Sequence, residues 1–240
     1  MQKSRIEWTD YTLNPIKGMC PVDCKDNQGK SYCYARAMYK RFKWNPEIRF
    51  EPEVFEPLFE LSESSRIFVG STIELFDSWV PAEWMAIILT DCKILNQHIF
   101  MFLTKRPQNL RFWAFPPNVW VGVSATNEMM AAAGIAWLSK VEASVKFLSL
   151  EPLLSWDSEN ANNSIIRWHP EYLNWVIIGQ QTPVRLKTMP KIGWIEEIIR
   201  SSDTAGIPVF LKDNLIPCVD QYEIALKDGK YRQEFPEVRL

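Results

Sequence analysis

Three of the five cysteines lie within fourteen residues near the N-terminus, at Cys20, Cys24 and Cys33, with the spacing C-x3-C-x8-C. Three soft thiolates on one loop are ligands of the kind that bind zinc or an iron–sulfur cluster. A structural zinc site usually has four protein ligands, whereas a [4Fe–4S] cluster held by three cysteines leaves one iron open. The cysteines therefore predict a metal centre, and their number favours an iron–sulfur cluster.

The alternative is a zinc site whose fourth ligand comes from elsewhere in the chain. The two histidines and the two other cysteines are the candidates for it: His98, His169, Cys92 and Cys218. Cys92 belongs to an apolar helical pattern and Cys218 follows a proline in the tail, so both are expected to be buried or incidental thiols. We expect His98 at the start of a strand, away from the metal loop, and His169 in an insertion.

Composition and length restrict the class of protein. The 240 residues are 47% hydrophobic and 23% charged, which is typical of a globular protein. We predict one domain over residues 1–240.

A net charge of −2 gives no general attraction to nucleic acid, although a local basic groove would still allow the protein to bind it. Residues 1–7 are not expected to form a signal peptide, because no apolar segment follows them, and no apolar run reaches the roughly 18 residues that would predict a membrane span. Clustered cysteines of odd number indicate a reducing cytoplasm.

Short apolar runs alternate with helical patterns along most of the chain. The runs expected to be strands cover part of 6–17 and then 66–72, 98–104, 118–124, 144–151, 174–179 and 206–212. The expected helices cover 32–43, 81–95, 108–114, 127–139 and 192–201, with one short helix in 47–65. This alternation indicates an α/β fold with a parallel sheet, which we interpret as a partial or complete (βα) barrel of TIM-barrel type. Periodicity alone does not distinguish it from an open, doubly wound sheet.

Polar residues follow the C-terminal ends of these strands, where α/β folds bind ligands. The candidate binding residues at these ends are Gly70, Ser71, Thr72, Lys105, Arg106, Ser124, Gly179 and Gln180. The cysteine loop follows the first strand, so it is expected at the same end. We also expect a loop insertion at 155–173 that covers the site, and a C-terminal tail from about residue 214.

Each strand-end residue has a structural alternative. Lys105 and Arg106 could hold a carboxylate or a phosphate, or simply face solvent. Glu151 ends an apolar strand, and burial would raise the pKa of its carboxyl unless it is paired, so it is the candidate catalytic residue. An ion pair with Lys212 would be the purely structural explanation. Glu74, in the loop after the second strand, is expected either to line the pocket or to be solvated.

Several short motifs occur in an order that resembles a known superfamily. They are Trp8-Thr9, Asn14-Pro15, Cys33-Tyr34-Ala35, Phe68-Val69-Gly70-Ser71, Leu103-Thr104-Lys105-Arg106-Pro107, Val121-Gly122-Val123-Ser124, Ser149-Leu150-Glu151-Pro152-Leu153-Leu154 and Trp175-Val176-Ile177-Ile178-Gly179. They resemble the radical S-adenosylmethionine superfamily, in particular a phage-type three-cysteine branch of unassigned reaction. Tyr32 would take the aromatic position before the third cysteine. The eight-residue gap before Cys33 and the pair Gln180-Gln181, where Gly-Glu is usual, depart from the pattern.

The resemblance implies a cofactor and a reaction. A [4Fe–4S] cluster on the three cysteines would bind S-adenosylmethionine, which the strand-end residues would surround. One electron from a flavodoxin- or ferredoxin-type donor would cleave it to methionine and a 5′-deoxyadenosyl radical, which would act on an unidentified small-molecule or nucleotide-type substrate. The alternative is a zinc-stabilised or catalytically degenerate phage-type binding or adaptor protein on the same scaffold.

Overall fold

The computed structural model describes residues 2–26, 28–156, 168–219 and 221–237. It has a mixed α/β fold whose main sheet contains eight strands, mostly parallel. The chain divides into two compact units, residues 1–120 and 121–239, and the boundary falls inside strand β7 (Val119–Ser124). No pairing that would close a barrel is found among the described strands. The α/β class is therefore confirmed, whereas the barrel and the single domain remain predictions.

The first unit contains the sheet order β1-β2-β5-β6. Its main strands are β1 (Gln2–Lys3), β2 (Tyr11–Leu13), β5 (Arg66–Val69) and β6 (Ile99–Thr104). The strands β2, β5 and β6 are parallel, as predicted, whereas β1 pairs antiparallel with β2. The sequence did not predict β1, because two polar residues carry no apolar pattern. A separate antiparallel pair joins β3 (Ile16–Lys17) to β4 (Arg49–Phe50).

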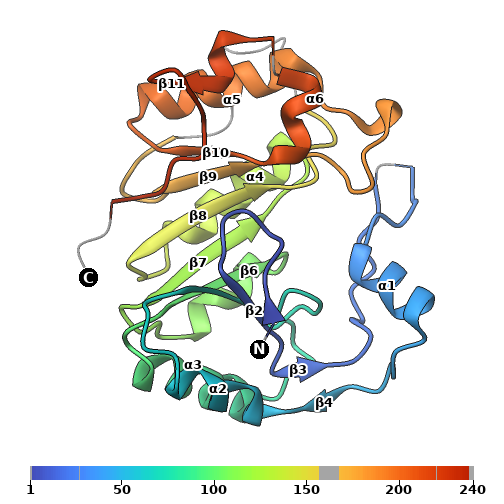
Figure 1. Cartoon of the computed structure of the whole chain (residues 1–240), viewed down its shortest axis with the longest axis vertical. Helices are drawn as coiled ribbons and strands as arrows, with labels where there is room; N and C mark the ends of the chain where they lie inside the picture. The colour runs from blue at the N-terminus through green and yellow to red at the C-terminus, as the bar shows by residue number, and fades with distance from the viewer. Residues whose placement is uncertain (1, 27, 157–167, 220, 238–240) are drawn as a thin grey trace. The chain divides into compact units, whose positions relative to one another are not determined.

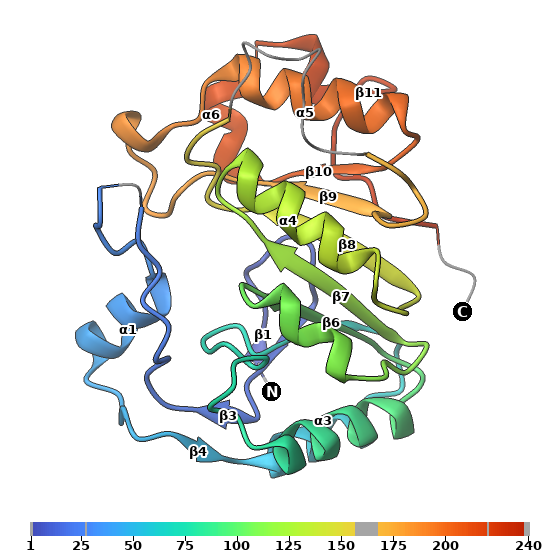
Figure 2. The ribbon, with the colours of Figure 1, turned by 180° about the vertical axis from the view of Figure 1, so that it is seen from behind.

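The helices of the first unit agree with the sequence patterns. They are α1 (Tyr34–Phe42), α2 (Glu56–Phe59), α3 (Ala82–Ile94) and the 3₁₀ segments η1 (Pro52–Phe55) and η2 (Pro107–Phe112). The helix expected at 108–114 is thus a 3₁₀ segment. Helices α2 and α3 lie along one side of the unit, and α1 stands out from its strands (Figures 1 and 2). Cys92 is buried on α3, as predicted.

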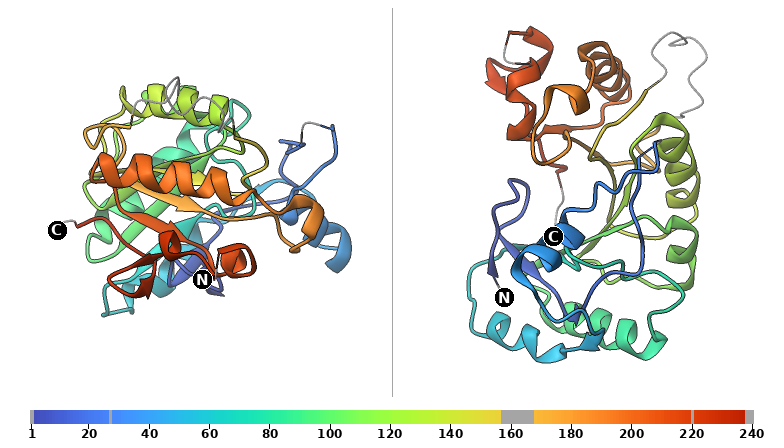
Figure 3. Two further views of the ribbon diagram at one scale, coloured as in Figure 1. Left: turned by 90° about the horizontal axis from the view of Figure 1, so that it is seen from above. Right: turned by 90° about the vertical axis from the view of Figure 1, so that its right-hand side faces the viewer.

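The second unit contains the sheet order β7-β8-β9-β10. The strands and helices that follow β7 are α4 (Glu128–Leu138), β8 (Val145–Leu150), β9 (Trp175–Ile178), α5 (Ile192–Thr204) and β10 (Val209–Leu211). All were predicted within a few residues. Asn127 caps α4 by accepting a hydrogen bond from Met130 N–H at 2.9 Å. Helix α4 contacts β8, and α5 runs beside β9 and β10 (Figures 2 and 3).

The C-terminal tail is structured and packs on the second unit. It contains η5 (Asp213–Leu215), α6 (Ile216–Val219), η6 (Glu223–Ala225) and the hairpin β11 (Leu226–Lys227) and β12 (Lys230–Tyr231). A further 3₁₀ segment, η4 (Leu186–Thr188), lies earlier in the chain, before α5. Gln233 forms an antiparallel bridge with Phe210 on β10. Most of the predicted insertion, residues 157–167, lies outside the described residues. No helix in the described part of the chain is long and apolar enough to cross a membrane.

Candidate functional site

The cysteine loop joins β3 to α1 and is tethered at both ends. Gly18 has φ +120°, and a Cβ there would lie 2.6 Å from Glu47 O, so only glycine suits this entry point. Its N–H donates to the buried Tyr39 hydroxyl at 2.8 Å. At the other end Cys33 caps α1, because its Sγ accepts a hydrogen bond from Arg36 N–H at 3.5 Å. The loop is therefore held between a glycine turn and a helix start.

The lengthened gap between the second and third cysteines forms a small hairpin. Lys25 and Ser31 make an isolated antiparallel bridge. Tyr32 N–H donates to Cys24 O at 3.0 Å, which places the residue before Cys33 beside the second cysteine. The chain thus turns back on itself between Cys24 and Tyr32, so Cys33 lies close to Cys24 despite the long gap in the sequence.

The three cysteines interact electrostatically. The Cys24 thiol shares a hydrogen bond with Cys33, which raises the pKa of Cys24 and lowers the pKa of Cys33. Burial raises the pKa of Cys20, and the negative charges of Glu74 and Cys33 raise it further. The positive charge of Lys105 lowers the pKa of both Cys24 and Cys33. All three thiols are free and half-buried, so they remain able to bind a metal.

The donor set fits an iron–sulfur cluster in its chemistry, since three free thiols on one loop are the usual ligands. Within the described ranges, however, no three His, Cys, Asp or Glu side chains are arranged to hold one metal ion. Two of the candidates for a fourth zinc ligand belong to the first unit. Cys92 is buried in α3, and the buried His98 ring has its Nε2 3.2 Å from Leu58 O. His169, in the second unit, is exposed and lies 3.8 Å from Glu171.

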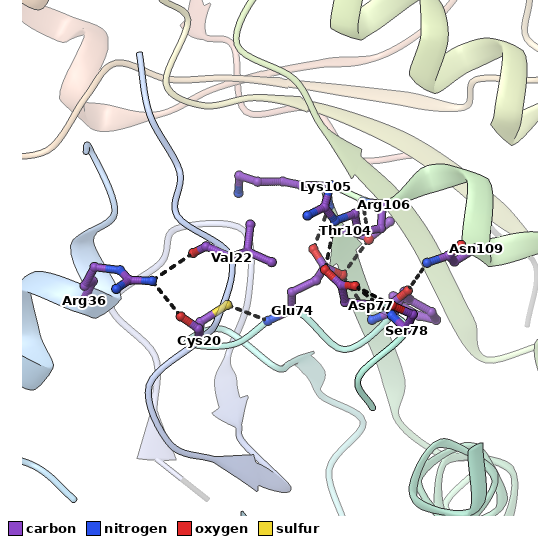
Figure 4. A network of polar contacts seen from close by, with 11 residues as sticks. Cys20, Val22, Arg36, Glu74, Asp77, Ser78, Thr104, Lys105, Arg106 and Asn109 are labelled. Carbon is purple, nitrogen blue, oxygen red and sulfur yellow. Dashed lines mark hydrogen bonds and ion pairs between the residues drawn. The ribbon is translucent and has the colours of Figure 1, made fainter. Parts of the chain in front are cut away.

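Glu74 is the centre of a polar network that reaches the cysteine loop (Figure 4). The residue is only 7% exposed, and its carboxylate accepts hydrogen bonds from the Thr104 hydroxyl at 2.6 Å, Lys105 N–H at 2.8 Å and Phe76 N–H at 3.1 Å. Its own N–H donates to Cys20 Sγ at 3.4 Å. Glu74 is therefore a buried structural anchor between the end of β6 and the first cysteine, and the solvated alternative is wrong.

Arg36 holds the loop from the opposite side (Figure 4). Its guanidinium donates to Cys20 O at 2.8 Å and to Val22 O at 3.5 Å, and it lies 3.9 Å from the Asp23 carboxylate. The sequence analysis missed this residue. Its signal was an arginine one helical turn after Cys33, a position from which a long side chain folds back over the helix N-terminus.

Lys105 and Arg106 end β6 but have different surroundings. The Lys105 side chain extends toward the segment that carries Val22 (Figure 4), consistent with its electrostatic effect on the loop thiols. Arg106 instead donates to the Asp77 carboxylate, with Nε 2.9 Å from Oδ2. Lys105 thus faces the cysteine loop, whereas Arg106 is occupied by an ion pair. Their predicted role in cofactor binding remains a prediction.

The turn after β5 is held by Asn14. The Asn14 side-chain oxygen accepts hydrogen bonds from the Ser71 hydroxyl and from both the backbone N–H and the hydroxyl of Thr72, each at 3.2 Å. Gly70 has φ +78°, the left-handed conformation that favours glycine. The hydroxyl of Tyr34, next to Cys33, donates to Ser71 O. The structure thus brings this predicted strand end against the start of α1.

Glu151 and Lys212 form an ion pair in the second unit. Lys212 Nζ lies 2.6 Å from Glu151 Oε1, so the pairing suggested as a structural explanation is confirmed. A Cβ at Gly179 would lie 3.0 Å from Lys212 Cδ and 3.2 Å from Glu151 Cδ. A larger residue at this position would therefore press on both members of the pair. A catalytic role for Glu151 remains a prediction.

Two further predicted residues of the second unit are buried with unsatisfied atoms. Gln180 and Asn214 exchange hydrogen bonds in both directions, yet Gln180 Oε1 has no partner among the described residues. The Ser124 hydroxyl, at the end of β7, is also without a partner within the described part of the chain. Buried unsatisfied groups are rare and often mark a place for water or a ligand. Neither signal was visible in the sequence.

A cavity of about 800 Å³ in the first unit lies away from all these residues. It is lined by the starts of strands and the segments before them: Lys3, Ser4, Arg5, Ile6, Glu7, Thr9, Asp10, Tyr11, Glu63, Ser64, Ser65, Arg66 and Ile99. Partial burial opposes ionisation of Asp10, but hydrogen bonds from Arg66 outweigh it and lower the pKa of this carboxyl. No predicted site residue lines the cavity, which adjoins the strand ends where α/β folds do not usually bind ligands.

These observations define the class as an α/β protein with a three-cysteine loop beside the C-terminal strand ends of its first unit. A family model described as "Protein of unknown function (DUF5131)" matches residues 3–218, and the chain belongs to this family. No curated protein and no solved structure matched.

The predicted membership of the radical S-adenosylmethionine superfamily is wrong. The family model that covers most of the chain is that of DUF5131, and no match indicates the superfamily. The motifs that suggested it are short strand ends and turns. In any α/β protein such positions favour small and polar residues for geometric reasons. A series of such motifs is therefore not specific for one superfamily.

Proposed function

We propose that this protein is an iron–sulfur enzyme in which Cys20, Cys24 and Cys33 hold a [4Fe–4S] cluster with one open iron. The supporting observation is the three-thiol loop: its thiols are free, and they interact electrostatically. The backbone N–H groups of Glu74 and Arg36 donate to two of the sulfurs. Such hydrogen bonds tune the reduction potential of a cluster. The family match names no reaction, so the proposal depends on these residues.

We propose S-adenosylmethionine as the ligand of the open iron. When bound to Cys20, Cys24 and Cys33 and reduced by one electron, the cluster would supply the chemistry for reductive cleavage of the carbon–sulfur bond of this ligand, to methionine and a 5′-deoxyadenosyl radical that would act on the substrate. An external one-electron donor of the flavodoxin or ferredoxin type would be its partner. The charge of Lys105 would favour the anionic thiolates, and the carbonyls and hydroxyls of Gly70, Ser71 and Thr72 suit an ammonium group. We propose that the strands form a partial (βα) barrel, whose C-terminal strand ends would face the ligand.

Metal analysis tests the first step. Protein reconstituted anaerobically with iron and sulfide should absorb near about 400 nm and contain about four irons per chain. Cys24→Ala should lose the absorbance and most of the iron. Cys218→Ala, which removes another half-buried thiol outside the loop, is the matched control and should retain both. Equal iron content in the two variants, or stoichiometric zinc without iron uptake in the unmodified chain, would refute the cluster.

The second step needs a separate measurement. Reconstituted protein with dithionite and S-adenosylmethionine should yield 5′-deoxyadenosine, detected by chromatography. A cluster that assembles without any cleavage would contradict the proposed reaction and would support a catalytically degenerate binding protein. The mutual hydrogen bonds of Gln180 and Asn214 are the observation that favours this second candidate. They give Gln180, which stands where the resembled pattern has a glutamate, a structural role.

A further inference from the structure

Helix α1 ends in an exposed stretch that is both basic and aromatic. Lys40, Arg41, Phe42, Lys43 and Trp44 are consecutive and all exposed. We name them the basic–aromatic surface. Phe42 and Trp44 are 52% and 42% exposed, which is unusual for such large apolar side chains. The surface lies on the part of the first unit that stands out from its strands (Figures 1 and 3).

The two aromatic rings are held in a defined arrangement. The Phe42 and Trp44 rings stack with centroids 5.5 Å apart and an interplanar angle of 22°. Trp44 also makes an edge contact with the buried Tyr39 at 5.3 Å. The left-handed conformation of Lys43, with φ 52°, ends the helix and brings Trp44 back over its last turn. The aromatic pair is therefore ordered before any partner binds, which lowers the entropic cost of binding.

The charge of this surface is positive and unopposed. Lys40, Arg41 and Lys43 have no ion pair with a carboxylate in the described part of the chain, although the whole chain has a net charge of −2. The Arg41 guanidinium lies over the Phe42 ring at 5.2 Å. Cations at a helix C-terminus interact favourably with the helix dipole, which explains their position. The dipole does not explain the two exposed, stacked rings of Phe42 and Trp44 beside these cations.

We propose that the basic–aromatic surface binds single-stranded nucleic acid. Ordered aromatic rings for base stacking, with cations beside them for the phosphates, are the features that proteins use to bind single strands. In a duplex the base faces are already stacked on one another, so the aromatic rings could not stack on them. The contacts would be sequence-tolerant, because every base offers a flat face. The inference does not depend on the proposed iron–sulfur chemistry.

Fluorescence anisotropy with a labelled oligo-dT of about 20 nucleotides tests the proposal on the full-length chain. We expect Trp44→Ala to weaken binding about tenfold, within the range measured when one stacking ring is removed. Replacing Lys40, Arg41 and Lys43 with Gln together should reduce the slope of log Kd against log salt by about 2, or about 0.7 per lost cation.

The matched control is a second exposed ring with a cation. Phe112 is 66% exposed and Arg111 lies 4.7 Å from the centre of its ring, so this site offers a comparable exposed ring with a cation away from helix α1. Phe112→Ala should leave oligo-dT binding unchanged. Circular dichroism of each variant should match the unmodified chain, and Trp44→Phe, which keeps a ring, should restore most of the affinity if Trp44→Ala is unstable.

Three results would overturn the proposal. The first is no binding of oligo-dT at low salt. The second is equal weakening by Trp44→Ala and Phe112→Ala, which would show adsorption by charge alone. The third is binding to vesicles of phosphatidylserine and phosphatidylcholine but not to oligo-dT, which would identify an anionic lipid surface as the partner.

Discussion

The buried carboxylate of Glu74 should be essential for the stability of the first unit. It accepts three hydrogen bonds, from Thr104, Lys105 and Phe76. In Glu74→Gln the amide oxygen can replace only one carboxylate oxygen, and the NH₂ group then faces a donor. A hydrogen bond to a charged group contributes about 1.5–3 kcal/mol, and a buried donor left unsatisfied costs about 1–3 kcal/mol. We therefore expect the free energy of unfolding to fall by about 2–4 kcal/mol.

Urea unfolding followed by circular dichroism measures this change, provided that the slope of the transition is the same for both proteins. The matched control is Asp77→Asn in the same loop, because Asp77 pairs with Arg106, whose side chain is 43% exposed. The Asp77 side chain is 16% exposed, but the open Arg106 side chain lets solvent screen the pair, and such a pair contributes about 0–1 kcal/mol, so the control should lose no more than that. If Glu74→Gln loses no more stability than Asp77→Asn, the anchor role is refuted.

The same variant should affect the cysteine loop. The Glu74 side chain holds the backbone whose N–H donates to Cys20 Sγ, so the loss of its hydrogen bonds should loosen that contact. We expect reconstituted Glu74→Gln to lose iron faster than Asp77→Asn in the presence of a chelator. Equal loss rates, together with a confirmed loss of stability, would limit Glu74 to a role in folding.

Three further predictions concern other parts of the chain. Gly122→Ala should lower the free energy of unfolding by about 1–3 kcal/mol, measured with urea, because the added Cβ would lie 2.4 Å from the Phe147 ring. Asn118→Ala should cost about 2–4 kcal/mol in the same assay, because its buried amide donates to three backbone carbonyls at 2.8 to 3.3 Å. Lys17→Met should raise the pKa of Glu51, measured by NMR titration, because the hydrogen bond from Lys17 is the largest cause of its lowered value. Because the pKa of Glu51 is lower in the folded state, its ionisation stabilises the fold at any pH above the ordinary pKa of a glutamate. The difference in the free energy of unfolding between the unmodified chain and Lys17→Met should therefore disappear as the pH falls through the lowered pKa of Glu51.

The sequence determined the local structure and the chemistry of the cysteine loop. Strands β5 to β10 and helices α1, α3, α4 and α5 were predictable, because apolar periodicity and capping residues depend on neighbours along the chain. The three cysteines indicated a metal centre for the same reason, since ligand type and spacing are properties of a short segment. The family assignment failed because it depended on short turns that many unrelated α/β proteins share.

Tertiary structure decided which of these residues act together. Glu74 and Thr104 are 30 residues apart, and Glu151 and Lys212 are 61 residues apart, so no local pattern could reveal either contact. Asn14 and Thr72, which meet at the turn after β5, are 58 residues apart. The sequence therefore determined which groups are available for chemistry, whereas burial and long-range contacts decided which of them are anchored, paired or exposed.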